Sequence, residues 1–315
     1  MNGSGAAPPL VSIIVPSYNQ GQFLRATLDS ILSQDYRPLQ VLVMDGASKD
    51  DSVAILRDYA ARHPELSWIS EPDGGPADAV NKGLARAEGA IAGIQSSDDV
   101  YLPGAISAAV AALQAHPEAG IVYGDAYLID EHDRQISQPT HWPAWTMERF
   151  LSMETFVLQS SAFFRTPLAR ELGGWDRRYF ACDVELWLRM MFRAPALKVD
   201  AVWSAFRRHE AQRDKQTRKI FESWWRVIDE SADLKTAPPR LRRAAGAGRR
   251  LIVQHYNPGS PWFRAGQLWL AILSYPPALR GLQHPAMLLP GLGRINRRLR
   301  GWLGRGSADI ATGAP

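Results

Sequence analysis

Two patterns of apolar positions alternate along the first hundred residues. Short apolar runs, typical of buried strands, occupy residues 10–16, 40–44, 66–70 and 90–94. Between these runs, apolar residues recur every three or four positions, as on one face of a helix, over residues 23–32, 53–60 and 79–88. This βαβαβαβ order predicts a mostly parallel sheet that helices cover on both faces.

The alternation continues after residue 100. A helix is expected to begin near Pro103, because proline is favoured at the first helical position. Residues 182–194 place apolar side chains on one face of a further helix. Strands are expected at residues 120–125, on both sides of a polar turn within residues 125–137, and at residues 161–165.

Three carboxylates follow the predicted strands directly. Asp45 comes after the second run, and Asp98 and Asp99 come after the fourth. Both members of the pair lie too far before Pro103 to cap the helix that starts there. Ligands of open parallel sheets bind beyond the carboxyl ends of the strands. Mg²⁺ or Mn²⁺, shared with a phosphate group, would supply the positive charge that these acids need.

Composition limits the class of protein. The chain has 315 residues, 46% of them hydrophobic and 22% charged, which fits one large globular domain with an extension. Cys182 is its one cysteine, which excludes an intrachain disulfide and a multi-cysteine zinc site and suits a reducing compartment. Residues 1–9 do not resemble a signal peptide, so we expect a flexible lead and a cytoplasmic protein.

Charge divides the chain into two unequal parts. Residues 1–140 carry a net charge of −10 and residues 141–315 a net charge of +14. From Arg240 onward there are 12 arginines and one acid, Asp309. An anionic partner is therefore expected at the C-terminal part. No recognised nucleic-acid-binding module accompanies these arginines, so we expect no nucleic-acid partner.

The last hundred residues, 216–315, are expected to form a helical, basic extension. Its apolar stretch is broken by prolines and cannot be an uninterrupted bilayer span of about 20 residues. Residues 295–303 repeat apolar positions at helical spacing among arginines, which suits a helix on an anionic membrane surface. The alternative is a helical subdomain that packs on the rest of the chain and turns its basic face to solvent.

Several blocks occur in a recognisable order. They are VSIIVPSYNQGQFLRATLDSILSQ, QVLVMDGASKDDS, SEPDGGPADAVNKGLARAEGAIAGIQSSDDVYLPGA, GGWDRRYFACDVELWLR and FRRHEAQR. Together they resemble the nucleotide-sugar domain of family 2 glycosyltransferases, over residues 11–209. The resemblance implies a GT-A fold, a Rossmann-like mixed and mostly parallel sheet flanked by helices, which we expect over residues 10–215.

The resemblance also implies roles for residues near the first two strands. Asp45 would bind the base of the nucleotide, with uridine favoured because a carboxylate accepts a ring N–H. Pro16, Ser17 and Tyr18 would line the nucleoside pocket. The alternative for Asp45 is a structural one, in which it starts a turn with Gly46.

The family's metal motif corresponds to residues 97–99. Here the resemblance implies that Asp99 binds the metal and that Asp98 holds the sugar or ribose. Asp73 would lie beside the nucleotide, and Lys82 would open the following helix near the same ligand. Asp78 is either a ligand or the cap of that helix.

The later blocks imply the reaction. Asp183 corresponds to the family's general base, with Cys182 at a position where an acid is frequent. Its alternative role is that of a helix N-cap. Arg207 and Arg208 would stabilise the departing diphosphate, and His209 would complete the metal shell.

These inferences predict an inverting glycosyltransferase. It would move a sugar from a nucleotide-diphosphate sugar to a glycan or lipid-linked hydroxyl in cell-surface polysaccharide synthesis, at the inner face of a membrane. Two alternatives are a nucleotidyltransferase and a non-catalytic nucleotide-sugar-binding subunit. The first is disfavoured because the segment after the first strand, VPSYNQGQF, carries no basic residue for a phosphate loop.

Overall fold

One eight-stranded mixed sheet runs through the computed structural model, which describes residues 7–210, 212–256, 259–282 and 285–289. The strand order is β3-β2-β1-β4-β7-β6-β8-β5, and β3, β2, β1 and β4 are parallel to one another. The strands are β1 Val11–Ser17, β2 Leu39–Asp45, β3 Leu66–Ser70, β4 Ile91–Ile94, β5 Val100–Tyr101, β6 Ile121–Ile129, β7 Ala162–Arg165 and β8 Ala196–Arg207.

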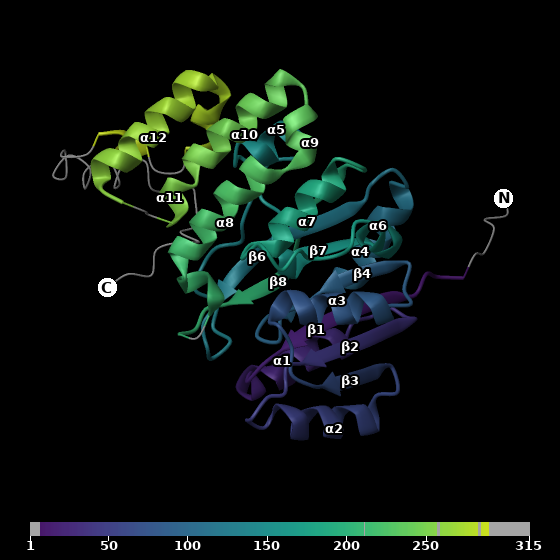
Figure 1. The fold of residues 1–315 in the computed structure, drawn as a ribbon. Coiled ribbons are helices and arrows are strands. Elements are labelled where there is room, and N and C mark those ends of the chain that lie inside the picture. Colours follow the sequence, from purple (N-terminus) through teal and green to yellow (C-terminus); the bar gives the residue numbers. More distant parts are fainter. Residues whose placement is uncertain (1–6, 211, 257–258, 283–284, 290–315) are drawn as a thin grey trace, which may run out of the picture.

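Helices cover both faces of the sheet (Figure 1). The α-helices are α1 Gly21–Leu32, α2 Ser52–Arg62, α3 Pro76–Arg86, α4 Ala105–Ala115, α5 Met147–Leu151, α6 Thr166–Glu171, α7 Cys182–Met191, α8 Thr217–Glu230, α9 Ala232–Thr236, α10 Pro239–Leu251, α11 Val253–Tyr256 and α12 Pro261–Ser274. Short 3₁₀ helices are η1 Gln159–Ser161, η2 Arg213–Lys215, η3 Pro276–Gly281 and η4 Pro285–Leu288. The predicted βαβαβαβ order of the first hundred residues is confirmed.

Alternate residues of the central strands build two hydrophobic cores. Ile13 and Val43 face one side, where they pack with α1, α2 and α4. Ile14 and Leu42 face the other side, where they pack with α3 and α7. Both faces are buried because each apolar run supplies side chains to both sides of the sheet.

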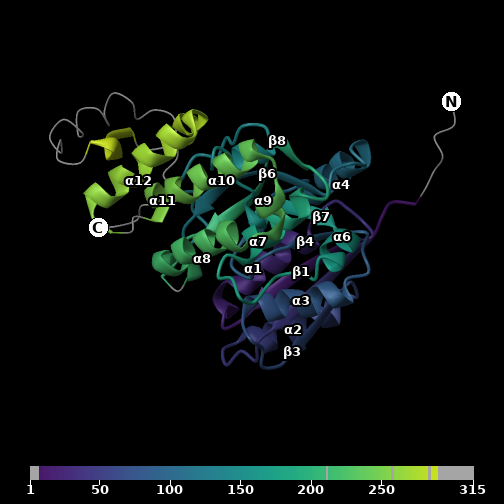
Figure 2. The ribbon, with the colours of Figure 1, turned by 45° about the horizontal axis from the view of Figure 1, so that its top comes forward.

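The C-terminal helices join the second of these cores. Trp224 of α8, Leu251 of α10 and Leu268 of α12 are buried in the same cluster as Trp187 of α7. Figures 1 and 2 show these helices together, at the opposite end of the molecule from α2 and β3. The described part of the extension therefore packs on the sheet domain and shares its core.

One glycine permits the close approach of the extension. A Cβ at Gly248 of α10 would lie 1.8 Å from the carbonyl oxygen of Leu151, the last residue of α5. Two residues earlier on the same helix, a Cβ at Gly246 would meet nothing within 4 Å. Only a residue without a side chain lets α10 contact the backbone of α5 at position 248.

Two predictions of local structure are wrong in detail. The helix after the acid pair begins at Ala105, because Gly104 has φ +80° and provides the N-cap, so Pro103 stays in the preceding turn. Residues 121–129 form one strand, and the return after the polar turn is an isolated bridge at Gln135. The Ser137 hydroxyl takes the Leu128 N–H that a regular ladder would use.

Two other expectations lie partly or wholly outside the described residues, namely the flexible lead and the helix over residues 295–303. In the described part of the chain, no helix is long and apolar enough to span a membrane.

Candidate active site

The carboxyl ends of the first three strands lie side by side. Ser17 is paired in register with Asp45, and Asp45 with Ser70. The fourth strand ends on the other side of β1, where Gln95 donates its N–H to the carbonyl of Ile14. The loops after these strands, which carry most of the predicted site residues, therefore start from one edge of the sheet.

Asp45 is buried and accepts three hydrogen bonds at this edge. One carboxylate oxygen accepts the Ser48 N–H at 3.0 Å and the Ser70 hydroxyl at 2.6 Å, and the other accepts the Ser48 hydroxyl. Gly46 donates its N–H to the Ser17 carbonyl. Asp45 thus stabilises the turn that it starts, as the structural alternative predicts, and its base-binding role stays a prediction.

The loops after β1 and β2 hold each other in place. Asn19 donates its N–H to the Ser48 hydroxyl and accepts the Lys49 N–H, both at 2.8 Å. Asn19 itself has φ +52°, which an asparagine tolerates better than most residues. The geometry of this edge is set before any ligand arrives.

The expected nucleoside pocket lies beside these loops. Tyr18 is 60% exposed, Pro16 is partly buried, and the buried hydroxyl of Ser17 has no hydrogen-bond partner. A Cβ at Gly46 would lie 2.9 Å from a carboxylate oxygen of Asp73 and 3.2 Å from the Tyr18 ring. The structure therefore brings Tyr18 and Asp73 close to Gly46.

Lys82 is already paired with acids. Its ammonium lies 2.8 Å from Glu71 and 3.6 Å from Asp78, and the bond to Glu71 raises the pKa of Lys82. Asp78 lies in the first turn of α3 and accepts the Gly74 N–H, while the N-cap position belongs to Gly75. The capping alternative for Asp78 is thus wrong in position, since the side chain reaches back from within the helix.

Asp99 faces the protein interior. One carboxylate oxygen accepts the backbone N–H of Arg207 at 2.8 Å, and the other is buried without a partner. Its carbonyl accepts the hydroxyl of Thr27 from α1. Burial, followed by the charge of Asp98, raises the pKa of Asp99 well above its ordinary value.

Asp98 points to a different neighbour. A carboxylate oxygen of Asp98 lies 2.9 Å from Nε2 of His209, and the Asp98 side chain is 15% exposed. The imidazole packs against the Phe23 ring of α1, with ring centroids 4.7 Å apart. The Asp98 oxygen and the His209 nitrogen are therefore direct neighbours, although the two residues are 111 positions apart in the chain.

Arg207 has a role that the sequence did not reveal. Its guanidinium is buried and donates to the carbonyls of Asp98 at 2.7 Å and Asp130 at 3.0 Å, and to the carboxylate of Asp133 at 2.6 Å. With these donors used inside the protein, Arg207 does not have the diphosphate role expected for it.

Arg207 and Arg208 are hard to tell apart in the sequence. The signal that separates them is their position on β8, where successive residues point to opposite faces of the sheet and Arg207 takes the buried side. Arg208 follows the end of β8 and is partly exposed, and its charge acts to lower the pKa of Asp99. Its contact with a diphosphate stays a prediction.

Asp183 is the second residue of α7. Ala181 occupies the N-cap position, so the capping alternative for Asp183 is wrong in position. Burial raises the pKa of Asp183, although hydrogen bonding to the Val184 N–H and the charge of Arg213 act in the opposite direction. A carboxylate with a raised pKa is a stronger base, which suits proton abstraction.

Two contacts fix the start of α7. Asn81 of α3 exchanges two 2.8 Å hydrogen bonds with the backbone of Trp175, in the loop before α7. Ser223 of α8 accepts the Ala181 N–H at 2.9 Å. The element that carries Asp183 is therefore held by the sheet domain on one side and by the extension on the other.

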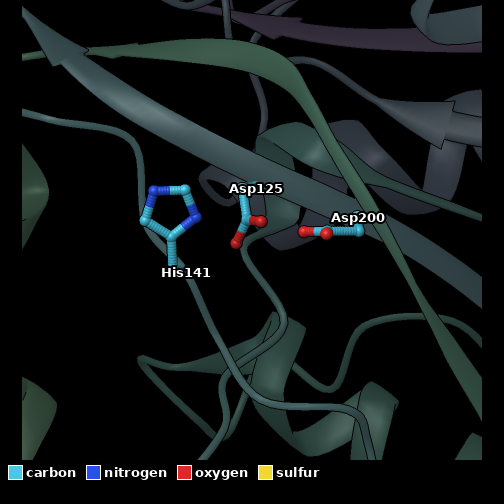
Figure 3. A group of neighbouring side chains, drawn as sticks. All are labelled: Asp125, His141 and Asp200. Atoms are coloured by element: carbon cyan, nitrogen blue, oxygen red, sulfur yellow. The ribbon is translucent and has the colours of Figure 1, made fainter.

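A different group of residues meets a geometric criterion for metal binding (Figure 3). In the part of the chain that the structure describes, Asp125, His141 and Asp200 have ligand atoms within 4.8 Å of one another. The Lys198 ammonium lies 2.7 Å from Asp125 and 3.2 Å from Asp200, so a cation already bridges the two carboxylates. We therefore assign this cluster to structure.

A shallow depression of about 600 Å³ lies where β2 and β3 begin, at the opposite ends of these strands from the site. Its lining includes Gln40 and Ser67, each the second residue of its strand. Two arginines in the lining, Arg86 and Arg170, donate to backbone carbonyls of α3. This depression is not part of the site described above.

The sequence family follows from a direct match. The family model described as glycosyl transferase family 2 matches residues 12–170, just over half of the chain. The chain belongs to glycosyltransferase family 2. Within the family match lie Asp45, Asp98 and Asp99, whereas Asp183 and His209 lie beyond its last residue.

Relatives of this family 2 member differ in how much of their length is matched. Chondroitin synthase of Escherichia coli is 31% identical over 144 residues, which are 46% of this chain and 21% of that protein. An uncharacterized glycosyltransferase of Mycobacterium tuberculosis is 33% identical over 187 residues, 58% of this chain and 68% of that protein. The chain therefore spans only about a fifth of chondroitin synthase.

Solved structures support the same fold. S. aureus TarS 1–349 in complex with UDP-GlcNAc has a TM-score of 0.65 at 18% identity, covering 94% of this chain and 92% of that chain. The mannosyltransferase PcManGT from Pyrobaculum calidifontis, in complex with GDP-Man and Mn²⁺, has a TM-score of 0.62 at 21% identity, covering 97% and 92%. The predicted GT-A fold with C-terminal helices is confirmed.

Proposed function

We propose that this family 2 member is an inverting glycosyltransferase. It would transfer a sugar from a nucleotide-diphosphate sugar, with UDP favoured, to a hydroxyl of a glycan or lipid-linked acceptor in cell-surface polysaccharide synthesis. The observation that carries the proposal is the approach of Asp98 and His209 to 2.9 Å, beside the strand ends where ligands of such sheets bind. Solved relatives of the same fold are described with UDP-GlcNAc and with GDP-Man and Mn²⁺.

The residues at this point fit a divalent cation. Adjacent ligands of an octahedral ion at about 2.1 Å lie about 3.0 Å apart, close to the separation of the Asp98 oxygen and the His209 nitrogen. We propose that Asp98 and His209 hold Mn²⁺ or Mg²⁺, and that Asp99 holds the loop through Arg207. The metal role that the sequence suggested for Asp99 thus passes to Asp98, because the Asp99 side chain is buried and bonded inward.

The remaining roles belong to the chain's own side chains. Tyr18 and Asp73 would contact the nucleoside beside Gly46, with Asp45 accepting a ring N–H of the base while it holds the turn. Arg208 would offset charge on the diphosphate. When bound, the cation would neutralise part of the charge that builds up on the leaving diphosphate.

Asp183 would act as the general base. It would take the proton of the acceptor hydroxyl while that oxygen forms a bond to the anomeric carbon and the bond from this carbon to the diphosphate oxygen breaks. The burial that raises its pKa supports this role, as does its place on a helix fixed by α3 and α8. A nucleotidyltransferase is not proposed, because the chain belongs to another family.

Calorimetric titration tests the site. The full chain is titrated with UDP, GDP, dTDP and their sugars, with and without Mn²⁺. We expect binding that depends on the metal, that is lost in Asp98→Asn and His209→Gln, and that is kept in Glu131→Gln, an exposed acid in the polar turn after β6. Equal binding without metal, or unchanged metal dependence in both site variants, would refute the metal assignment. Binding without sugar transfer to any acceptor would favour the non-catalytic alternative.

A further inference from the structure

Helix α12 exposes a continuous apolar face. Its inner residues Ala265, Leu268 and Ala271 are buried against the rest of the extension. Its outer face carries Trp262, Phe263, Trp269, Leu270 and Leu273, which are 71, 41, 45, 47 and 74% exposed. We call these five residues the α12 outer face.

The spacing makes this face a single stripe. At 100° per residue, its five residues lie within about a third of the helix circumference. Gly266 lies in the same stripe, and the polar residues Arg264 and Gln267 lie outside it. A helix that packs on a soluble domain normally turns polar residues outward. Helix α12 instead has apolar residues on both faces, which indicates an apolar contact on its outer face as well.

The concentration of exposed apolar groups is specific to this region. Among the described residues, nine large hydrophobic side chains are exposed, and seven of them lie between residues 262 and 289. The other two are Tyr18, in the expected nucleoside pocket, and Ile136, in the polar turn after β6. Soluble proteins rarely expose contiguous apolar patches of this kind unless the patch meets a partner or a membrane.

The α12 outer face is held in a fixed position. Trp269 donates its indole N–H to the carbonyl of Leu288 at 3.1 Å. Arg250 of α10 donates to the Gln267 side chain at 3.2 Å, which ties α12 to the helix that contacts α5. The exposed side chains therefore belong to a built surface of the fold.

Charge distinguishes between possible occupants of the face. Residues 234–308 contain no Asp or Glu, whereas 12 arginines lie between Arg240 and Arg305. Two copies of α12 packed face to face would bring together two segments of like charge, since the described residues 234–256, 259–282 and 285–289 contain seven arginines and no Asp or Glu; such a contact is unfavourable. An anionic bilayer instead attracts the arginines, while its interface accepts tryptophan, phenylalanine and leucine.

We propose that the α12 outer face is a membrane-docking surface, which inserts Trp262, Trp269 and Leu273 into the interface of an anionic bilayer. The surface lies among the described helices, whereas the sequence had pointed to residues 295–303. This inference deepens the proposed function by naming what would bring the enzyme to a lipid-linked acceptor. The proposed function supplies only the reason why the enzyme would dock on a membrane, and the docking itself does not depend on it.

Vesicle flotation of the full chain tests the proposal. Vesicles of phosphatidylcholine alone are compared with vesicles that also contain phosphatidylglycerol, at low and high salt. We expect the native chain to float with the anionic vesicles and less so at high salt. The double variant Trp262→Ser/Leu273→Ser should bind them roughly tenfold or more weakly, because two exposed apolar anchors are lost. Both residues are mostly solvent-exposed, so its unfolding transition should match that of the native chain.

The matched control is Ile136→Ser, which removes an apolar side chain that is 54% exposed outside the extension. It should float like the native chain. Native-like flotation of the double variant, or no flotation of the native chain on either vesicle, would overturn the proposal. A third outcome would also overturn it: the native chain is a dimer in solution, and the double variant is a monomer with unchanged flotation. A second copy of the chain would then cover the face. Nucleotide-sugar titration of the same samples separates this outcome from a failure of the proposed function.

Discussion

The contact between α10 and α5 gives a sharp prediction about the extension. Gly248→Ala adds one methyl group at the point where a Cβ would lie 1.8 Å from the Leu151 carbonyl oxygen and 2.9 Å from its carbon. Real Cβ atoms essentially never come closer than 3.0 Å to such an atom, so the two backbones must separate by at least 1.2 Å, from 1.8 to 3.0 Å. Gly246→Ala makes the same chemical change on the same helix, in open space.

The expected free energies differ in sign. In a helix interior, Gly to Ala is intrinsically stabilising by up to about 1 kcal/mol, and Gly246→Ala should show this gain. In Gly248→Ala the same gain is outweighed, because forcing extra volume into a packed contact costs about 1–3 kcal/mol or more. Leu251 and Ala247, both fully buried on α10, would lose packing as the helix moves. Because both variants gain the same helix propensity, we expect them to differ in unfolding free energy by the cost of the packed contact alone, about 1–3 kcal/mol or more.

Urea denaturation of the two full-length variants, followed by circular dichroism, measures this difference. Vesicle flotation of Gly248→Ala adds a second readout, because displacement of α10 would also displace α12. If the two variants have the same unfolding free energy within about 0.5 kcal/mol, which is the usual spread for neutral surface changes, α10 does not contact α5 as described.

Four further variants test the site and its surroundings. Asp183→Asn should keep nucleotide-sugar affinity and lose turnover. In the native chain, turnover should be lost as the pH falls through the pKa of Asp183, which burial raises above the ordinary carboxyl value of 3.8. Arg213→Gln should move that acid limb to higher pH, since the Arg213 charge lowers the pKa, and an unmoved limb in a kcat–pH profile would exclude Asp183 as the group observed. Lys198→Met should destabilise the fold by about 3–5 kcal/mol in urea denaturation by leaving the buried Asp125 charge unpaired, and Asp125→Asn in the same chain should recover much of the loss. Arg207→Lys should lower both stability and nucleotide-sugar affinity, because a compact ammonium cannot span the three acceptors that the planar guanidinium reaches through separate nitrogens. Normal values of both would contradict the assigned role.

The first four strands could be predicted from the sequence because periodicity is a local signal. Apolar runs such as residues 66–70 became strands with the predicted limits. The return after β6 was harder to predict, because the hydroxyl of Ser137 competes with the backbone for a ladder position. The start of α4 depended on a glycine at φ +80°, which outweighed the preference of Pro103 for the first helical turn.

The site was predictable in its composition and less so in its connections. Asp98 and Asp99 are chemically identical neighbours, and only the fold shows that one meets His209 and the other the Arg207 backbone. The contact of Lys198 with Asp125 crosses 73 positions and has no sequence motif. Such long-range pairings depend on the register between β6 and β8, which hydrophobic spacing alone does not specify.

The buried guanidinium of Arg207 also has a thermodynamic consequence. It holds the main chain of the acid loop at Asp98 and the turn at Asp130, so the conformational entropy of both segments is lost during folding. A nucleotide-sugar that binds to the folded protein then needs to order only side chains such as that of Asp98. A preorganised loop of this kind lets more of the contact energy appear as affinity.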